Sequence, residues 1–543
     1  MSEITHLPAD SNQALGIARY AIDFLSDDPA TRGEPSEAVM ERTNQFFTDA
    51  SICGVSALAL GTNAPTLLRE EALDYPAAGG RPAAGAGPAA GVGGGATCFG
   101  SAEAVRPEKA IVANCAAVRE WDSNGTNFGY NPQRGQTAGE FGHNDFYPVC
   151  VAAAQLTGAT GERALRAMVC LDEIRGRLAE AFGLKSYKID HVLHGAIASA
   201  AVYGAMRGAT AEQIESAIGM TVAHYVPFRA IRAGKQLSDS KGSSAALSAE
   251  AAVQSVHRSM RGFLGPRDIF RNPEAVFRLF EGPGRLFQRV GAAEADTRDD
   301  DASPFDLWLT RAGDDFAIMG MHFKLGLYEH QSAGAIQAVI DLLSAHPGLL
   351  AEPDGGKIAS ITITAYEPAF GIIGDPAKRH PTTRQSADHS MVYIIATLLR
   401  KALEQRAEGG SPTWQSLILT PHDYSPRAID HPLTRRLMDR IEFAHGGPEY
   451  DARYPDGIPT SVVIEDEGGE RHDSGLVMYP AGHARNAGAP LTDLLANMWL
   501  TLGRLASDEP EHLVARFQAL RSKDAGEIAT IHGFDLNITP AGI

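Results

Sequence analysis

Two segments of the sequence combine apolar character with small side chains. Residues 196–208 read AIASAAVYGAMRG, and residues 245–252 read AALSAEAA. Side chains this small suit helices whose backbones approach their neighbours closely, so both segments predict the crowded interior of a helical body. Between residues 14 and 73, apolar residues return every three or four positions, which predicts that the chain also opens with helices.

The sequence changes character around Pro266. Residues 305–310 (FDLWLT) and 316–319, joined by RAGDD, predict a β-hairpin, and residues 358–366 (IASITITAY) alternate as a β-strand does. A helix is predicted between them, over residues 332–345. The simplest fold class that accounts for this order is a mostly α protein with an α+β insert.

Beyond the insert, helical periodicity returns over residues 388–404. Two short strands, 460–464 and 475–478, are predicted to flank the turn EDEGGERH as a second β-hairpin. A last helical run is expected to begin with Thr492 or Asp493 as its cap.

Charge and cysteine spacing exclude several classes of protein. The 543 residues include 48 basic and 66 acidic ones, and the resulting charge of −18 disfavours nucleic acid or an anionic membrane surface as a partner. The five cysteines form no C-x-x-C pair, which argues against a zinc ribbon or an iron–sulfur cluster. No apolar run is long enough to span a membrane, and the start MSEITHLPADSN does not resemble a signal peptide, so we expect a cytoplasmic protein.

Residues 76–95, PAAGGRPAAGAGPAAGVGGG, form a low-complexity stretch. The backbone entropy of so many glycines is too large for a core to offset, so we predict a surface loop without chemistry. A phosphate-binding loop is the functional alternative, but no Lys-Ser/Thr pair follows and no strand pattern precedes it.

Four clusters of polar residues are candidates for chemistry. The first contains Asp122, in WDSNGT, and His143, in GHND. Both segments are predicted loops, which often carry catalytic residues, but a helix cap and an exposed histidine would also explain them.

The second cluster, DHVLH, places Asp190 beside His191. A carboxylate can orient an imidazole whose proton moves near pH 7; a capping aspartate and a buried histidine are the alternative.

The other two clusters are cationic. The third gathers Arg229, Arg232, Lys235 and Lys241 in an otherwise acidic chain. Arginine binds carboxylates through two parallel hydrogen bonds, so this cluster suits a small polyanionic substrate; a solvated helix face is the alternative. In MHFKLGLYEH, Lys324 lies inside an apolar stretch, where a lysine either extends to water or is held for a function.

Together the clusters supply acids, bases and groups that bind anions, without a metal or cofactor motif. This combination suits removal of a proton next to a carboxylate, followed by loss of a β-substituent. Lysine or arginine would stabilise the developing negative charge, and histidine would protonate the leaving group. The residues by themselves indicate only this class of reaction.

Five stretches make the sequence resemble the MmgE/PrpD family, in particular its 2-methylcitrate dehydratase branch. They are DHVLHGAIASAAVYGAMRGATAEQI (190–214), SDSKGSSAALSAEAAV (238–253), FKLGLYEHQSAGAIQAV (323–339), ADHSMVYIIATLL (387–399) and MYPAGHAR (478–485). The resemblance implies a large all-helical domain built from both chain ends, a smaller α+β lid domain, and a homodimer. The implied bounds are 1–270 for the first helical part, 271–385 for the lid, and 386–543 for the return to the helical domain with a short β-hairpin.

The resemblance also implies a site without a cofactor or metal. The implied catalytic residues are Asp122, His143, His191, Lys241, Lys324 and His330. The implied substrate-binding residues are Arg229, Arg232, His389 and His483. Asp122 matches the first aspartate of the family motif D-F-[DN]-D-T, and His143 matches the histidine of the G-H-P or T-H-P that follows. Lys324 matches the lysine of F-K-x-x-[FY]-P.

The implied activity is that of a hydro-lyase, which dehydrates a 2-methylcitrate-like hydroxy-tricarboxylate to an aconitate-type alkene. Asp122 or a histidine is the expected base, and His143 or His330 the expected proton donor. The sequence departs from the family pattern at Gly125, which replaces the second motif aspartate. The alternatives are therefore a cis-aconitate-type decarboxylase, an epimerase of a related di- or tricarboxylate, or a carboxylate-binding protein without catalysis.

Overall fold

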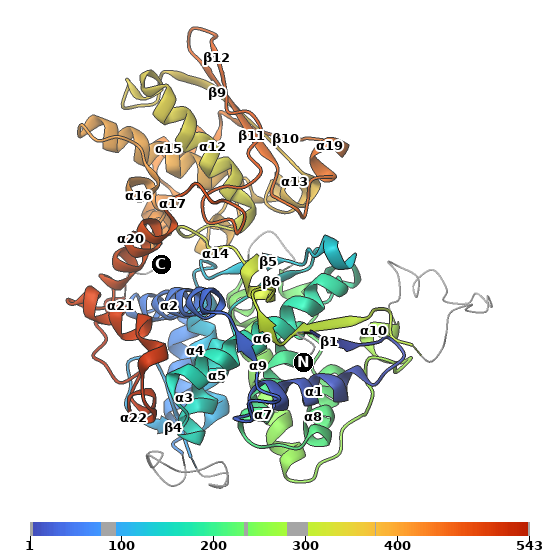
Figure 1. The fold of residues 1–543 in the computed structure, drawn as a ribbon. Coiled ribbons are helices and arrows are strands. Elements are labelled where there is room, and N and C mark those ends of the chain that lie inside the picture. Colours follow the sequence, from blue (N-terminus) through green and yellow to red (C-terminus); the bar gives the residue numbers. More distant parts are fainter. Residues whose placement is uncertain (1–3, 78–93, 233–236, 280–301, 375, 541–543) are drawn as a thin grey trace.

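Helices dominate the first 260 residues, as the sequence predicts. The computed structural model describes residues 4–77, 94–232, 237–279, 302–374 and 376–540. The helices of this first part are α1 (Gln13–Phe24), α2 (Glu37–Ala59), α3 (Asn63–Leu73), α4 (Pro107–Arg119), α5 (Tyr147–Thr157), α6 (Gly161–Ala181), α7 (Val192–Met206), α8 (Ala211–His224) and α9 (Asp239–Met260). They form the helical body in the lower half of Figure 1.

The two small-residue segments form α7 and part of α9, which pack against each other. α6 and α8 also pack against α7, and α4 packs against α9. Gly195 shows why small residues are needed here, because a Cβ atom at this position would lie 2.0 Å from the ring of Phe146. The prediction of a crowded helical interior is confirmed.

Helices from the C-terminal end complete the helical body. α20 (Leu491–Gly503) and α21 (Pro510–Gln518) pack against α2, and α22 (Ala525–Ala529) packs against α5. The indole of Trp499 on α20 donates a 3.1 Å hydrogen bond to Asp49 on α2. Figure 1 shows these helices, in red, beside the blue α2, so segments from both ends of the chain lie together.

Gly161, at the start of α6, leaves no room for a side chain. Its Cβ would lie 1.7 Å from the carbonyl oxygen of Leu520. Since a backbone atom cannot move aside cheaply, Gly161→Ala is expected to lower the free energy of unfolding by about 2 kcal/mol. Gly348→Ala is the matched control, because nothing lies within 4 Å of its Cβ position. Equal urea midpoints for the two variants would contradict this packing.

The α+β part occupies the upper half of Figure 1. Its sheet has the strand order β10–β9–β11–β12, with bounds β9 (Ile358–Ala365), β10 (Ile441–His445), β11 (Thr460–Asp466) and β12 (Arg471–Asp473). β10 runs parallel to β9, and β11 runs antiparallel to it. α12 (Ala333–Ala345) packs against β11, and α15 (Met391–Ala407) packs against α12 and β10. The helix at 332–345 and the strand at 358–366 are thus confirmed.

One expected domain boundary passes through this sheet. β9 precedes the boundary between residues 385 and 386, whereas its partners β10 and β11 follow it. The α+β part therefore continues beyond the expected lid, because the periodicity of residues 388–404 marks a helix without showing which part of the molecule it joins. The division of the chain into domains stays a prediction.

The predicted hairpin at 305–319 is wrong. β7 (Leu307–Thr310) is a strand, but its antiparallel partner is β1 (Ile4–Leu7), near the N-terminal end of the chain. Residues 317–320 form a 3₁₀ helix instead of the second strand. Alternation along a segment indicates extended backbone and a buried face, but it does not select the partner strand.

Two predictions near the C-terminal end also need correction. β11 forms its hairpin with β12, whereas Val477 makes only an isolated bridge to Thr460. α20 begins directly after Pro490, so Thr492 and Asp493 lie inside its first turn and do not precede it. In both cases the element exists and its boundary was misplaced by a few residues.

The remaining described elements are short. Two-stranded sheets pair β2 (Glu34–Pro35) with β8 (Ala312–Gly313), β3 (Ala96–Thr97) with β4 (Ala104–Val105), and β5 (Thr126–Phe128) with β6 (Phe141–His143). The short helices are α10 (Val276–Leu279), α13 (Glu367–Ile372), α14 (Arg384–Ala387), α16 (Trp414–Leu417), α17 (Pro426–Ile429), α18 (Pro432–Met438) and α19 (Pro448–Asp451). All five cysteines are buried free thiols.

Within the described ranges, no single helix has the length and apolar character to cross a membrane. α2 and α3 meet that test only when taken together, and they are bent by 90°. Most of the predicted glycine-rich loop, residues 78–93, lies outside the described residues.

Candidate active site

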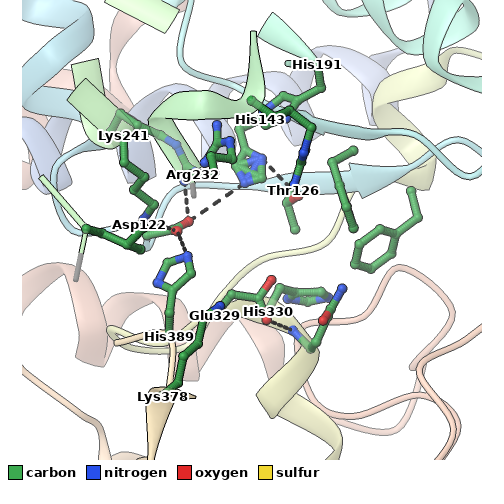
Figure 2. A pocket seen from close by; sticks show the side chains of 16 residues that line it. Asp122, Thr126, His143, His191, Arg232, Lys241, Glu329, His330, Lys378 and His389 are labelled. Carbon is green, nitrogen blue, oxygen red and sulfur yellow. Dashed lines mark hydrogen bonds and ion pairs between the residues drawn. The ribbon is translucent and has the colours of Figure 1, made fainter. Parts of the chain in front are cut away.

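A pocket lies where the helical body meets the α+β part, and residues from the predicted clusters line it (Figure 2). Asp122, His143 and His191 come from the helical wall, and Glu329, His330 and His389 come from the opposite wall. The lining residues are Arg119, Asp122, Thr126, Phe128, Phe141, His143, His191, Arg229, Arg232, Leu237, Lys241, Glu329, His330, Gln331, Lys378 and His389.

Asp122 follows the C-terminal end of α4 and is almost completely buried. Its φ of +52° lies in the left-handed region, which aspartate tolerates better than most side chains. Its carboxylate accepts hydrogen bonds from the amines of Lys241, at 2.7 Å, and Lys324, at 2.5 Å. Arg119, from the last turn of α4, donates a further short hydrogen bond to the same group.

The charges around Asp122 determine its protonation. Burial alone would raise its pKa, but Arg119, Lys241 and Lys324 together hold the pKa of Asp122 well below its usual range. The carboxylate is therefore ionised at neutral pH and is a weak proton acceptor. Three cations around one carboxylate leave an excess of positive charge, which favours a substrate anion and opposes a metal cation.

His389 approaches Asp122 from the opposite wall (Figure 2). Its Nε2 atom lies 3.1 Å from Oδ2 of Asp122, and its Nδ1 atom is hydrogen-bonded to Asp388. Arg384 donates a 3.1 Å hydrogen bond to Asp388 and also forms an ion pair with Glu120, which follows α4. A continuous network of buried polar contacts thus connects the two walls.

His143 and His191 form a stacked pair on the helical wall, with ring centroids 5.1 Å apart. Nδ1 of His143 is 3.2 Å from the hydroxyl of Thr126, and its Nε2 is 3.7 Å from Asp122. Neither ring nitrogen of His191 has a hydrogen-bond partner, although Asp190 lies 3.5 Å from its Nδ1. Burial, assisted by nearby cations, holds the pKa of both rings well below the usual value, so both are neutral and can accept a proton.

A small sheet, and not the predicted free loop, positions His143. β5 and β6 pair antiparallel, with Thr126 directly opposite His143. Thr126 also exchanges backbone hydrogen bonds of 3.0 and 2.7 Å with His322. Gly142 permits this close pairing, because a Cβ there would lie 2.3 Å from the amide oxygen of Asn127.

Arg229 and Arg232 lie on a short 3₁₀ helix at the edge of the pocket. The guanidinium group of Arg232 donates two hydrogen bonds to the carboxylate of Asp190, and one of them is 3.1 Å long. Nη1 of Arg229 is buried and has no hydrogen-bond partner, which leaves it available to a carboxylate. The alternative of a solvated helix face is therefore wrong for these arginines. Lys235 lies outside the described residues.

The opposite wall contributes groups that the sequence reasoning did not assign. Burial raises the pKa of Glu329, although His389 and Lys324 lie near it, and its carboxylate accepts a 2.8 Å hydrogen bond from the backbone of Gln331. Both ring nitrogens of His330 and both ends of the Gln331 amide are buried without a hydrogen-bond partner. Buried polar groups are rarely left unpaired, so these face a position where a ligand would satisfy them. Burial also lowers the pKa of His330 well below its usual value.

The structure gathers most of the predicted site residues at this pocket. Those on its surface are Asp122, His143, His191, Arg229, Arg232, Lys241, His330 and His389. Lys324 contacts Asp122 from behind the lining. His483 is not part of the lining; it stacks on His322, with ring centroids 4.0 Å apart. The roles of all these residues stay predictions.

Arg119, Glu329, Gln331 and Lys378 are the polar residues that the sequence reasoning missed. Arg119 could have been found, because it precedes Asp122 by three residues at the end of a helix. Glu329 stands beside His330 within a stretch already singled out. Gln331 has the same signal on the other side of His330, whereas Lys378 has none, since only folding brings it to the pocket.

Chemically, the pocket can bind a small polyanion and move protons. Its cations outnumber its two carboxylates, Asp122 and Glu329. Its neutral imidazoles can accept a proton, and the raised pKa of Glu329 favours the form that can donate one.

Parts of the chain are similar to a known family and to known proteins. Residues 29–286 match the model of the MmgE/PrpD N-terminal domain. The chain is 24% identical over 353 residues to a 2-methylcitrate dehydratase of Escherichia coli (strain K12), covering 64% of each chain. It is 23% identical over 360 residues to a 2-methylcitrate dehydratase of Salmonella typhimurium, covering 65% of this chain and 66% of the relative. The matches thus span just under two thirds of the length of these relatives.

Proposed function

From the premise that residues 29–286 belong to the MmgE/PrpD N-terminal domain family, we propose that this chain is a dehydratase of a small hydroxy-polycarboxylate. The resemblance inferred from the sequence is confirmed at the level of the family. The proposed substrate resembles 2-methylcitrate, which the names of the relatives suggest. Catalysis without a cofactor, a cytoplasmic location and a homodimer are parts of the same proposal.

The observation that carries the proposal is the juxtaposition of a surplus of cations and neutral imidazoles around one pocket. Arg229, with its unpaired Nη1, and Arg232 would bind substrate carboxylates, and Lys241 would add charge beside the reacting carbon. An extended polyanion would be repelled by the overall charge of −18, but a small one meets only this local excess of positive charge.

We also assign the two proton transfers to opposite walls of the pocket. The carboxylate oxygens of Asp122 are already bound by Arg119, Lys241 and Lys324, whereas neither ring nitrogen of His191 has a hydrogen-bond partner. We therefore assign removal of the proton beside the carboxylate to His143 or His191. The C–H electron pair becomes the new C=C bond as the C–O bond breaks. Glu329, from the opposite wall, gives its proton to the departing hydroxyl, which leaves as water.

Direct assay tests this function. The full chain is incubated with citrate, 2-methylcitrate and their isomers, and the ultraviolet absorbance of the conjugated alkene is followed. Formation of alkene supports a dehydratase. Carbon dioxide release, or loss of optical rotation without alkene, would assign the chain to the decarboxylase or epimerase alternative. Saturable binding without turnover would instead indicate a carboxylate-binding protein.

Glu329→Gln is expected to lower kcat by about 100-fold with little change in KM, because the amide cannot donate the proton to the leaving hydroxyl as an acid does. The proton donor must be protonated, so wild-type kcat should fall as pH rises through the raised pKa of Glu329. This alkaline decline should be absent from the variant. Asp341→Asn is the control, since burial also raises the pKa of Asp341 but this residue does not line the pocket. Identical pH profiles for wild type and Glu329→Gln would exclude Glu329 as the donor.

A further inference from the structure

A second cavity, of about 350 Å³, carries an unbalanced group of arginines. Arg106, Arg207 and Arg261 line it, and Glu108 is the one carboxylate among its described lining residues. Arg106 and Glu108 form a 2.6 Å ion pair, so their charges compensate each other. Nε of Arg207 is buried without a hydrogen-bond partner. The described lining residues carry three positive charges and one negative charge, a sum of +2 in a chain whose total charge is −18.

His257 lines the same cavity as the three arginines. Its Nε2 is hydrogen-bonded to the hydroxyl of Tyr203 at 2.8 Å, and its Nδ1 lies 3.9 Å from Glu108. Burial, together with the positive charges of Arg207, Arg261 and Arg106, lowers its pKa to about 4, although Glu108 acts in the opposite direction. The ring is therefore neutral at pH 7 and does not supply a counter-charge. The surplus charge stays on the guanidinium groups.

Helix dipoles explain only part of this arrangement. Arg207 and Arg261 are the C-caps of α7 and α9, where a cation is favourable. Arg106 is the N-cap of α4, where a cation is unfavourable and an anion is favoured. A ligand with negative charge at this cavity would therefore satisfy the arginines and the N-terminus of α4 at once.

We propose that this cavity binds a small multivalent oxyanion, with Arg207 and Arg261 as its principal ligands. Phosphate and a polycarboxylate share the required chemistry, because both offer oxygens to the paired donors of a guanidinium group. The volume of about 350 Å³ lies within the range of small-ligand sites, roughly 300–1,000 Å³.

The proposed site is separate from the active-site pocket. The helices α4, α7 and α9 each run from the active-site pocket to the arginine-lined cavity. Arg119, His191 and Lys241 lie at the pocket end of these helices. Arg106, Arg207 and Arg261 lie at the cavity end. The 16 residues from Lys241 to His257 on α9 correspond to about 24 Å at a rise of 1.5 Å per residue. An anion bound at one end cannot contact the other, so the two binding events can be measured independently.

Isothermal titration calorimetry of the full chain with inorganic phosphate and, separately, with citrate tests the proposal. Arg207→Gln should weaken binding of the preferred anion at this cavity by about 10-fold, the size expected for loss of one charge-assisted interaction. Arg207→Gln/Arg261→Gln should abolish this binding event, and binding of citrate at the active-site pocket should persist. Arg436→Gln, on the exposed side of α18, is the matched control for the change of charge and should leave the affinity unchanged. Arg229→Gln, in the active-site pocket, should also leave this binding event unchanged.

The two titrants distinguish which class of anion the cavity binds. Binding of phosphate that depends on Arg207 and Arg261 assigns a tetrahedral oxyanion, and equivalent binding of citrate assigns a polycarboxylate. If the double variant does not fold, which its urea midpoint will show, the two single variants replace it, each with an expected 10-fold loss. Absence of saturable binding of either anion, or binding lost only in Arg229→Gln, overturns the proposal.

Discussion

Asp122→Asn is expected to lower kcat/KM for the proposed dehydration by about 1,000-fold, and it should also destabilise the chain. The carboxylate balances Arg119, Lys241 and Lys324, and it contacts His389 across the pocket. An uncharged amide would leave these buried cations without their counter-charge, and loss of one partner of a buried ion pair costs about 3–5 kcal/mol.

Asparagine is the informative substitution because it isolates the charge. At φ +52° most side chains would strain the backbone, whereas asparagine accepts this conformation as readily as aspartate. The measurement combines steady-state kinetics with urea unfolding. A normal kcat/KM in a folded Asp122→Asn variant would show that the charge at this position is not needed for turnover.

Asp49→Asn is the matched control for the activity of Asp122→Asn. It is also expected to change strongly how the stability of the chain depends on pH. Asp49 is completely buried on α2, and burial raises its pKa to about 8, although the hydrogen bond from Trp499 and the charge of Lys324 act in the opposite direction. Its carboxyl group is therefore mostly protonated at pH 7, and replacing it with an amide changes little charge. We expect the kcat/KM of this variant to stay within a few-fold of wild type.

The stability of Asp49→Asn relative to wild type should depend strongly on pH. A carboxyl group whose pKa is raised in the folded state stabilises the protein fully below its unfolded pKa of about 3.9, and this contribution is lost as pH rises through the folded pKa. Wild type should therefore lose about 1.4 kcal/mol per pH unit relative to the variant between pH 5 and 7.5. The difference should level off above the folded pKa of about 8.

Urea unfolding of both proteins at pH 5, 6, 7 and 7.5 measures this difference. A constant difference over that range would show that Asp49 is not protonated in the folded chain. In that case Asp49 would carry a second negative charge near Lys324, and it could not serve as an uncharged control for Asp122.

Much of the helical body could be predicted from local pattern. The spacing of apolar residues marks α2, and the alanines of α7 and α9 mark helices in close contact, because both signals depend only on residues a few positions apart. The predicted hairpin at 305–319 is wrong because strand pairing depends on residues far apart in the sequence. β7 pairs with Ile4–Leu7, some 300 residues away, and no local pattern identifies a partner at that distance.

The residues of the candidate site also differ in whether a local sequence pattern marks them. Asp122, His143 and Lys241 were found because each stands in a polar cluster or a recognisable stretch of sequence. Lys378 was not, since it is ordinary in its own segment and only folding brings it to the pocket.

The sequence by itself determined that the chain is mostly helical, that it resembles the MmgE/PrpD family, and which polar clusters are candidates for chemistry. Only the tertiary structure decided which of those groups lie together and how they are charged. Three cations converge on Asp122 and keep it ionised, whereas burial leaves the imidazoles of His143 and His191 neutral. The reason is physical: protonation depends on the charges and the loss of water around a group, and both are set by residues distant in sequence.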